Sequence, residues 1–349
     1  ERMKPRHIAL LMSLTALPLL AAGCFSIKTG TPDGGVFRSA DAGTTWTQKV
    51  FVAQVKDKVQ TIGSVSVNAL IMDPNDHNTL YAITAGSGIY KTTDSGDHWA
   101  ATGLAKGGWN SLAIDPTSSA LLYAGSGGSI VKSADAGRTW SAVYVETRPD
   151  QAVQSLAVDP NDATRILAGM NTGVILESRD YGNTWKILSV VTGAVQQLFL
   201  FPASSTMYAQ AGTSLVRSTD KGASWTPIPV ALTEGTATVN SLATFSNSPS
   251  ELTAATSLGF VRSHDSGKTW ESIRTLTSSP SPLSVDRVAV DPVERTHLYA
   301  VIGTRFHTSL DDGRTWNVHV LPTGRRITAF LIRPDQPMTM FLGTYVVKK

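Results

Sequence analysis

One short pattern recurs seven times along this chain and limits what it can fold into. Each copy is an octet that begins with Ser or Thr, has Asp at its third position and Gly at its fifth, and ends in Trp. The closing tryptophans are separated by 53, 41, 45, 40, 45 and 46 residues. A period of about 20–50 residues is typical of propellers and solenoids. The aspartates and tryptophans of the seven octets are, in order, Asp41 and Trp46, Asp94 and Trp99, Asp135 and Trp140, Asp180 and Trp185, Asp220 and Trp225, Asp265 and Trp270, and Asp311 and Trp316.

A second motif alternates with the octets and also occurs seven times. It consists of an apolar run, a polar turn that often contains Asp-Pro, and a second apolar run, as in VQSLAVDPNDATRILAG at 153–169. Proline cannot donate a ladder hydrogen bond, so it marks the turn between two strands. Each octet then joins two more strands, as in GSIVKSADAGRTWSAVYV at 128–145. Four strands in each of seven repeats, without helical periodicity, predict an all-β chain that forms a single seven-bladed β-propeller with four-stranded antiparallel blades.

The order of the motifs at the two ends predicts how the ring closes. The first octet has no strand pair before it, and the last strand pair has no octet after it. We therefore expect the N- and C-terminal strands to share one blade, which removes the exposed sheet edges of an open ring. The segment Tyr345-Val346-Val347 also resembles the start of a third strand and competes with Val36-Phe37 for one place. The sequence leaves open whether one of them is displaced.

The N-terminal segment has the features of an export signal. Three basic residues precede the apolar run IALLMSLTALPLLAAG, which ends at Cys24, the single cysteine of the chain. The sequence around it, LAAGC, resembles a bacterial lipobox, and this resemblance implies lipid attachment at Cys24 and anchoring to the membrane of the bacterial cell envelope. The alternative is an ordinary secretory signal with an incidental cysteine. The expected organisation is a signal peptide at 1–23, a flexible tether at 24–35 and the propeller at 36–349.

The octets match the Asp-box, or BNR, repeat of sialidases and several other propellers. The copy at 92–99 departs from it, with His98 at the seventh position. The aspartate accepts hydrogen bonds within its own turn, and the tryptophan buries about 150–250 Å² of surface. Because a propeller spreads such turns around its rim, we expect all seven aspartates to be structural rather than parts of one active site.

Resemblances among Asp-box propellers narrow the function. Sialidases carry a Phe/Tyr-Arg-Ile-Pro motif, but the nearest segment here, Val36-Phe37-Arg38-Ser39, lacks Ile-Pro. Xyloglucan-degrading enzymes have very similar repeats but pair two propellers around a cleft, and this chain has enough residues for one. In length and repeat style the chain resembles photosystem II stability/assembly factors and the larger sortilin luminal domain. That resemblance implies a non-catalytic scaffold that binds a protein or peptide. The alternative is a glycan-active propeller, either a glycoside hydrolase or a carbohydrate-binding protein.

A ring of polar residues is the candidate ligand site. In each copy of the second motif, a polar residue follows the leading apolar position, at the mouth of the innermost strand on the face opposite the octets. One interpretation is that these side chains satisfy backbone groups of the next blade or line a water-filled channel. The other is that, with the adjacent Arg287, they bind a polypeptide or another ligand. The ring comprises Asn68, Asn110, Gln154, Gln196, Asn240, Asp286 and Thr328.

Charges and aromatic residues on the same face offer few sites for chemistry. Glu146 and Asp150 share a loop and are the one pair of acids to consider, because paired catalytic carboxylates lie about 5–9.5 Å apart. Trp109 and Tyr144 are the aromatic residues left over for a sugar platform. The longest loop, 50–66, is expected on this face. The basic residues of this face have two interpretations, a basic patch or an ordinary solvated rim. These residues are Lys56, Lys58, Arg305, Arg325 and Arg326.

Composition excludes several other classes of partner. The net charge of +3 is too small for a nucleic-acid-binding protein, and no basic run interleaves with aromatic residues. The seven histidines lack metal-ligand spacing. We therefore expect no metal, no cofactor and no nucleic acid.

Overall fold

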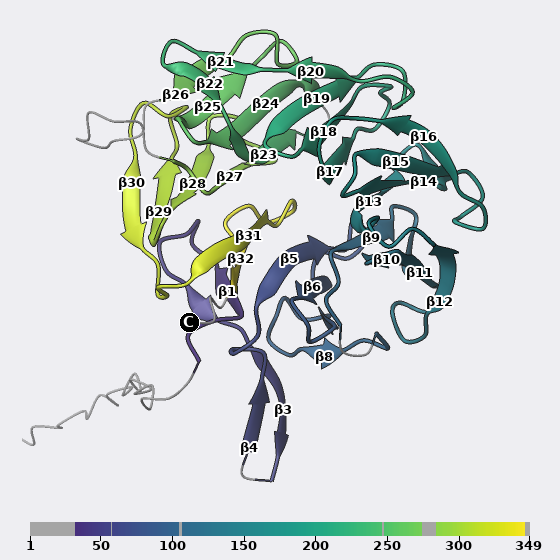
Figure 1. The fold of residues 1–349 in the computed structure, drawn as a ribbon. Helices are drawn as coiled ribbons and strands as arrows, with labels where there is room; N and C mark the ends of the chain where they lie inside the picture. The colour runs from purple at the N-terminus through teal and green to yellow at the C-terminus, as the bar shows by residue number, and fades with distance from the viewer. Residues whose placement is uncertain (1–31, 57, 105–106, 246–247, 274–283, 346–349) are drawn as a thin grey trace, which may run out of the picture. The chain divides into compact units, whose positions relative to one another are not determined.

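The repeats fold as seven four-stranded antiparallel sheets arranged as blades around a central axis (Figure 1). The structure is a computed structural model that describes residues 32–56, 58–104, 107–245, 248–273 and 284–345. The chain divides into residues 1–31 and a unit formed by residues 32–349. Cys24 and the predicted signal peptide lie outside the described residues. No helix occurs in the part of the chain that is described, so the predicted all-β, seven-bladed fold is confirmed.

Six blades follow one another along the chain, and each begins with its innermost strand. The first three are β5(Val67–Met72), β6(Leu80–Thr84), β7(Ile89–Thr92) and β8(Ala100–Ala101); β9(Ser111–Asp115), β10(Ser118–Ser126), β11(Ser129–Ser133) and β12(Ser141–Val145); and β13(Val153–Asp159), β14(Asp162–Met170), β15(Val174–Ser178) and β16(Lys186–Val190). The next three are β17(Val195–Leu200), β18(Met207–Ala211), β19(Ser214–Ser218) and β20(Thr226–Ile228); β23(Val239–Phe245), β24(Ser248–Thr256), β25(Gly259–Ser263) and β26(Glu271–Ile273); and β27(Arg287–Val290), β28(Leu298–Ile302), β29(Arg305–Ser309) and β30(Asn317–Val320).

The seventh blade is built from both ends of the chain, as the motif order predicts. Its inner strands are β31(Arg326–Ile332) and β32(Met340–Tyr345), and its outer strands are β1(Val36–Ser39) and β2(Thr47–Gln48). β1 pairs with β32 in a register that places Phe37 opposite Leu342. β1 therefore occupies the place next to β32, while residues 346 and 347, its competitors in the sequence, lie outside the described residues.

Residues 32–35, which the sequence places in the tether, belong to the unit that contains the propeller. The side-chain amide of Gln48 donates to the carbonyl oxygens of Pro32 and Gly34 at 2.6 and 2.7 Å. Gly35 has a φ of +83°, and a Cβ there would lie 2.7 Å from the carbonyl oxygen of Ile62. Because glycine has no side chain, the backbone at Gly35 can lie this close to Ile62 and adopt a positive φ.

Each octet forms the same hydrogen-bonded turn between the third and fourth strands of a blade. In the third octet, Ser133 Oγ accepts the N–H of Gly137 at 2.9 Å. One carboxylate oxygen of Asp135 accepts the N–H of Thr139 at 2.8 Å, and the other accepts its hydroxyl at 2.6 Å. These donors hold the pKa of Asp135 down to about 2, from its ordinary value near 3.8, with the Thr139 hydroxyl contributing most. The carboxylate is occupied by its own turn, which supports a structural role.

The second octet forms the same turn although its seventh residue differs. His98 stands where the other octets have Thr or Ser, and its Nδ1 lies 2.7 Å from Oδ2 of Asp94. The backbone N–H of His98 donates to Asp94 at 2.9 Å, as the equivalent N–H groups do elsewhere. The imidazole therefore occupies the hydroxyl's position, and the exception in the sequence leaves the turn intact.

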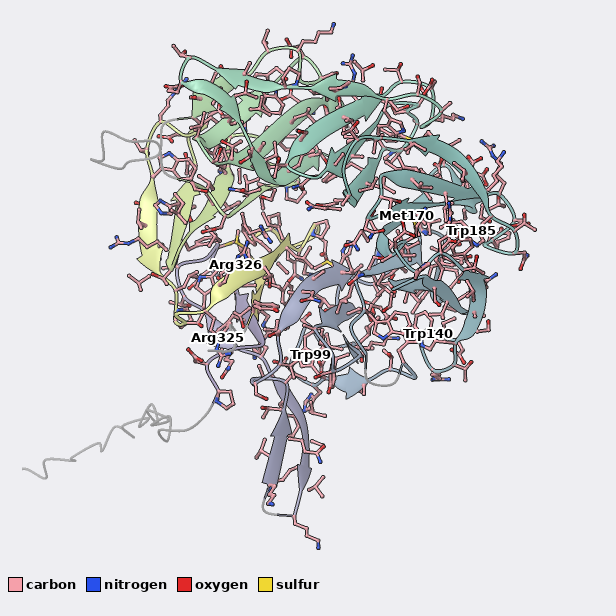
Figure 2. The ribbon with its side chains drawn as sticks, viewed as in Figure 1. Trp99, Trp140, Met170, Trp185, Arg325 and Arg326 are labelled. Carbon is pink, nitrogen blue, oxygen red and sulfur yellow. The ribbon has the colours of Figure 1, made fainter. Side chains whose placement is uncertain are left out.

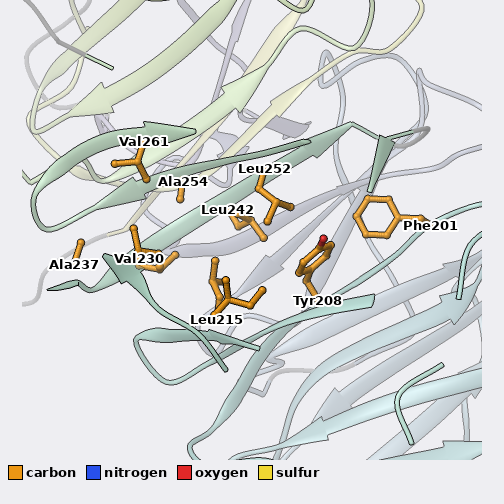
Figure 3. Packing of buried hydrophobic residues seen from close by; sticks show 11 residues of the cluster. Phe201, Tyr208, Leu215, Val230, Ala237, Leu242, Leu252, Ala254 and Val261 are labelled. Carbon is orange, nitrogen blue, oxygen red and sulfur yellow. The ribbon is translucent and has the colours of Figure 1, made fainter. Parts of the chain in front are cut away.

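The apolar core lies between neighbouring blades. One cluster joins the fourth and fifth blades through Tyr208, Leu215, Leu242 and Leu252, all buried (Figure 3). Octet tryptophans pack against the edges of such clusters, as Trp140 does against residues of the first and second blades. Trp140 and Trp185 lie toward the outer edge of their blades (Figure 2), away from the axis.

Two segments that connect neighbouring blades contain hairpins. The long segment 50–66 forms β3(Phe51–Val55) and β4(Lys58–Thr61), which project from the ring (Figure 1). The segment 230–238 forms β21(Val230–Leu232) and β22(Gly235–Ala237). Strands of three to five residues are hard to recognise in a sequence because they are too short to show a clear alternating pattern.

Candidate functional site

The innermost strands surround a cavity of about 500 Å³ on the axis of the ring. Seven of the eight residues of the candidate ligand site line this cavity, namely Asn68, Asn110, Gln154, Gln196, Asn240, Arg287 and Thr328. Asp286 is the exception, because its carboxylate turns away and accepts the N–H of Gly303 at 2.7 Å. Six of the seven stand at the equivalent position of their blades, at the start of the innermost strand, and Arg287 stands one residue later. The ring brings these positions to one axis.

Several of these side chains join one blade to the next. Asn110 Nδ2 donates to the carbonyl of Val153 at 2.9 Å, and Asn240 Nδ2 donates to that of Val285 at 2.7 Å. The Thr328 hydroxyl donates to the carbonyl of Val67, which links the closing blade to the first. Each acceptor is on the neighbouring blade. For these residues the interpretation that polar side chains satisfy the next blade's backbone agrees with the geometry.

Two further side chains make the same kind of bond and were missed in the sequence. Ser155 Oγ donates to the carbonyl of Val195 at 2.7 Å, and Gln210 Nε2 donates to that of Val239 at 3.0 Å. Both residues line the cavity. Ser155 immediately follows a member of the ring, whereas Gln210 lies on a second strand, where the repeat alignment offers no signal.

Other side chains in the ring are free to meet a ligand. Asn68, Gln154 and Gln196 line the cavity, and no hydrogen bond joins their amides to any described residue. Gln196 is exposed. Ser111 also lines the cavity, and its buried hydroxyl has no hydrogen-bond partner in the described part of the chain. The ring thus contains both bonded groups and groups with free hydrogen-bonding capacity.

Arg287 is the one charged residue among the described residues that line the cavity. Its Nε donates to the carbonyl of Thr328 at 3.1 Å, and Nη1 donates to that of Asp286 at 2.8 Å. Burial lowers the pKa of the guanidinium, and the nearby cation of Arg326 lowers it further. Arginine remains charged in spite of such a shift, so the cavity holds a positive charge.

The pair of acids on the loop after β12 does not provide two equivalent carboxylates. The Glu146 side chain is only 5% exposed and accepts four bonds. They come from the Tyr144 hydroxyl at 2.8 Å, from the backbone N–H of Arg148 at 3.0 Å, and from Nε and Nη2 of Arg148 at 2.9 and 2.7 Å. The Arg148 side chain is the main reason that the pKa of Glu146 lies far below its usual range. Glu146 is therefore ionised and unsuited to act as a general acid. Asp150 is exposed, and its backbone carbonyl accepts Asn171 Nδ2 at 2.9 Å, which positions the loop.

The leftover aromatic residues do not form an exposed sugar platform. Trp109 is half-buried, and it packs against the cluster between the first and second blades. Tyr144 is also half-buried, and its ring centroid lies 6.0 Å from that of Trp185. Sugar contacts on this face must therefore rely mainly on polar groups.

The basic residues of the rim do not form one patch. Lys56 and Lys58 lie at the tip of the β3–β4 hairpin, while Arg305 begins β29. Arg325 and Arg326 lie at the start of β31 (Figure 2), but Arg325 Nε is 2.6 Å from a carboxylate oxygen of Asp33. This ion pair neutralises the charge of Arg325.

The described residues contain no group of three or more His, Cys, Asp or Glu side chains arranged to hold a metal ion. No helix among them has the length and apolar character needed to cross a bilayer.

Comparison with known sequences points to carbohydrate chemistry. No family model matches the chain. A xyloglucanase from Paenibacillus is 29% identical over 226 residues, which are 58% of this chain and 20% of the relative. A xyloglucanase from Hypocrea jecorina is 26% identical over 259 residues, which cover 60% of this chain and 30% of the relative. One from Acetivibrio thermocellus is 30% identical over 219 residues, which cover 56% of this chain and 23% of the relative. The chain thus spans less than a third of the length of these relatives.

Comparison with solved structures confirms the fold. A GH74 xyloglucanase from Xanthomonas campestris matches with a TM-score of 0.63 and 19% identity, over 80% of this chain and 51% of the enzyme. The GH74 enzyme of Niastella koreensis matches with a TM-score of 0.65 and 18% identity, over 85% of this chain and 53% of the enzyme. YCF48 from Cyanidioschyzon merolae matches with a TM-score of 0.61 and 13% identity, over 80% of this chain and 96% of YCF48. At these identities the likeness extends to the fold alone.

The comparisons correct the expected function. The sequence predicts a non-catalytic scaffold for a protein partner, and this prediction is wrong, because the four curated relatives that match are all named xyloglucanases. The expectation that the chain is not an enzyme is wrong for the same reason. The error arose because one propeller fold serves both enzymes and binding proteins, so repeat style and length do not distinguish them. The chain is a seven-bladed propeller whose curated relatives point to a glycoside hydrolase.

Proposed function

We propose that this chain is a propeller of a xyloglucan-active glycoside hydrolase. The observation that carries the proposal is the similarity to xyloglucanases over more than half of the chain. The polar face around the axis supports it, since a polysaccharide rich in hydroxyl groups needs such donors and acceptors. Enzymes of this kind pair two propellers around a cleft.

Asp150 is the residue of this face that we assign to the reaction. Its neighbour Glu146 is bound by Arg148 and Tyr144, whereas Asp150 is exposed on a loop that Asn171 holds in place. Asn171 also accepts the N–H of Ala152 at 2.7 Å, so the loop is fixed on both sides of the acid. A carboxylate in this position can act as a general base or stabilise positive charge on the sugar.

The test is binding and cleavage of xyloglucan by the chain as it stands. Xyloglucan should retard the protein in affinity gel electrophoresis, while starch should not. Release of reducing ends should fall at least tenfold in Asp150→Asn, and the control Glu234→Gln, an exposed acid on another loop of this face, should keep its activity. If xyloglucan is bound but not cut, the catalytic assignment fails and a carbohydrate-binding role remains. If it is neither bound nor cut, the proposal is wrong.

We also propose that the protein is exported and attached to the membrane of the cell envelope through a lipid on Cys24. The basic and apolar residues before this cysteine support the proposal. Stable anchoring by acyl chains keeps a protein with the membrane fraction. Expressed in bacteria with labelled palmitate, the protein should incorporate label and sediment with membranes. Cys24→Ser should abolish labelling and release the protein, and equal labelling of both forms would refute the assignment.

A further inference from the structure

The cavity on the axis contains a cation, Arg287, that has no ion-pair partner among the described residues. The charge of Asp286 acts on it only from a longer distance and raises its pKa, against the larger effect of burial. No carboxylate of the described residues lies within ion-pair distance of Arg287, and no acid among them lines the cavity. The carboxylate of the adjacent Asp286 accepts the Gly303 N–H instead. Arg287 is half-buried, and a charge that is partly removed from water is stabilised by pairing with an opposite charge. The arrangement therefore leaves a place for a negative group.

The guanidinium is held in a fixed orientation with one nitrogen unused. Nε donates to the carbonyl of Thr328 and Nη1 to that of Asp286, at 3.1 and 2.8 Å. Nη2 makes no hydrogen bond to any described residue. Nη1 also donates to the carbonyl of Asn240 at 3.5 Å. Since all three bonded carbonyls are backbone groups, the protein fixes the position of Arg287 without neutralising its charge. A fixed guanidinium with free N–H groups suits a carboxylate.

The remaining free groups of the cavity suit hydroxyls. The amides of Asn68, Gln154 and Gln196 can each donate and accept, and the buried Ser111 hydroxyl has no partner among the described residues. These residues come from the first four blades, whereas Arg287 comes from the sixth. A ligand that contacts both sets needs a carboxylate at one end and several hydroxyls at the other. The cavity volume of about 500 Å³ falls in the usual range for small-molecule sites.

We propose that the axial cavity binds a small polyhydroxylated carboxylate, of the size and chemistry of a hexuronate, with its carboxylate on Arg287 and its hydroxyls on the free amides. This inference goes beyond the proposed function and does not rest on it, because a neutral polysaccharide supplies no carboxylate. It also assigns a role to the ring that is separate from Asp150.

The first experiment is calorimetric titration of the protein with D-glucuronate. Glucuronate should bind at least tenfold more tightly than D-glucose and D-glucuronamide, which match its shape but lack the charge. It should also bind at least tenfold more tightly than acetate and inorganic phosphate, which lack the ring of hydroxyls. Equal binding of acetate or phosphate would mean a simple anion site and would overturn the proposal, as would no binding of glucuronate.

Variants then locate the site. Arg287→Gln should weaken glucuronate binding at least tenfold, whereas Arg326→Gln, which removes a nearby charge that does not line the cavity, should change it less than twofold. Gln196→Trp should also abolish binding by filling the cavity, and Gln196 is exposed and makes no bond between blades. This variant decides the matter if Arg287→Gln does not fold. Unchanged binding in Gln196→Trp, or equal losses in the two arginine variants, would exclude the cavity. Because xyloglucan cleavage is measured separately, either proposal can fail without the other.

Discussion

Phe306→Ala should lower the free energy of unfolding by about 3–5 kcal/mol, the usual cost of removing a buried aromatic ring. Phe306 is completely buried on β29. Its ring centroid lies 5.2 Å from that of Trp46, 6.1 Å from that of Tyr299 and 5.6 Å from that of Phe330. Trp46 and Phe330 belong to the closing blade, so the substitution opens a cavity where the two ends of the chain meet the sixth blade.

Urea unfolding followed by tryptophan fluorescence measures this effect. Val320→Ala, in the same blade at 74% exposure, is the control and should change the free energy by less than about 0.5 kcal/mol. A loss below about 1 kcal/mol in Phe306→Ala would show that the contact between the sixth and closing blades contributes little to stability.

Glu177→Gln should destabilise the third blade by about 3 kcal/mol, since it removes one partner of a buried ion pair. The Glu177 side chain is 1% exposed, and its carboxylate lies 2.8 Å from Nε of Arg165, which is 3% exposed. Arg165 also pairs with Asp159 at 2.9 Å and donates to the carbonyl of Lys221 on the next blade at 2.6 Å. Loss of the Glu177 charge leaves the buried guanidinium with one carboxylate instead of two.

The effect of Glu177→Gln should depend on pH. Burial favours the neutral acid, but hydrogen bonds from Arg179 and Arg165 outweigh it and hold the pKa of Glu177 below its ordinary value of 4.5. A lowered pKa adds stability above about pH 4.5, and this contribution is lost as the pH falls through the folded-state value. The difference in the free energy of unfolding between wild type and Glu177→Gln should be widest above pH 5 and narrow at pH 3. The exposed acid Glu271, changed to Gln, serves as the control, and a gap that does not change with pH would contradict the assignment.

The fold was predictable because its signals are local. Each octet contains all the groups of its own turn, from Ser133 to Thr139 in the third copy, so its meaning does not depend on distant residues. The alternating strand pairs then set the number of blades, and their order at the ends determined the closure through β1 and β32. The contacts of residues 32–35 could not be predicted, because they are made with Gln48 and Ile62, which are distant in sequence.

The site was only partly predictable because its properties depend on neighbouring blades. Repeat alignment found the ring, but it could not show that Asn110 is bonded to the next blade whereas Gln154 is free. It placed Glu146 beside Asp150 without showing that Arg148 neutralises the former. Nor could it show that the side chain of Asp286 turns away while that of Arg287 enters the cavity. These differences depend on side-chain directions set by tertiary packing.

The shared blade also affects how the chain can be made. Gly35 and Thr344, which are bonded across the closing blade, are 309 residues apart in sequence. β1 and β2 precede every other blade strand in the chain, yet their inner neighbours β31 and β32 follow the other six blades. During synthesis β1 therefore keeps an unpaired strand edge until β31 and β32 appear, and such edges invite aggregation. Folding of the ring is thus completed only when these two strands reach the first ones.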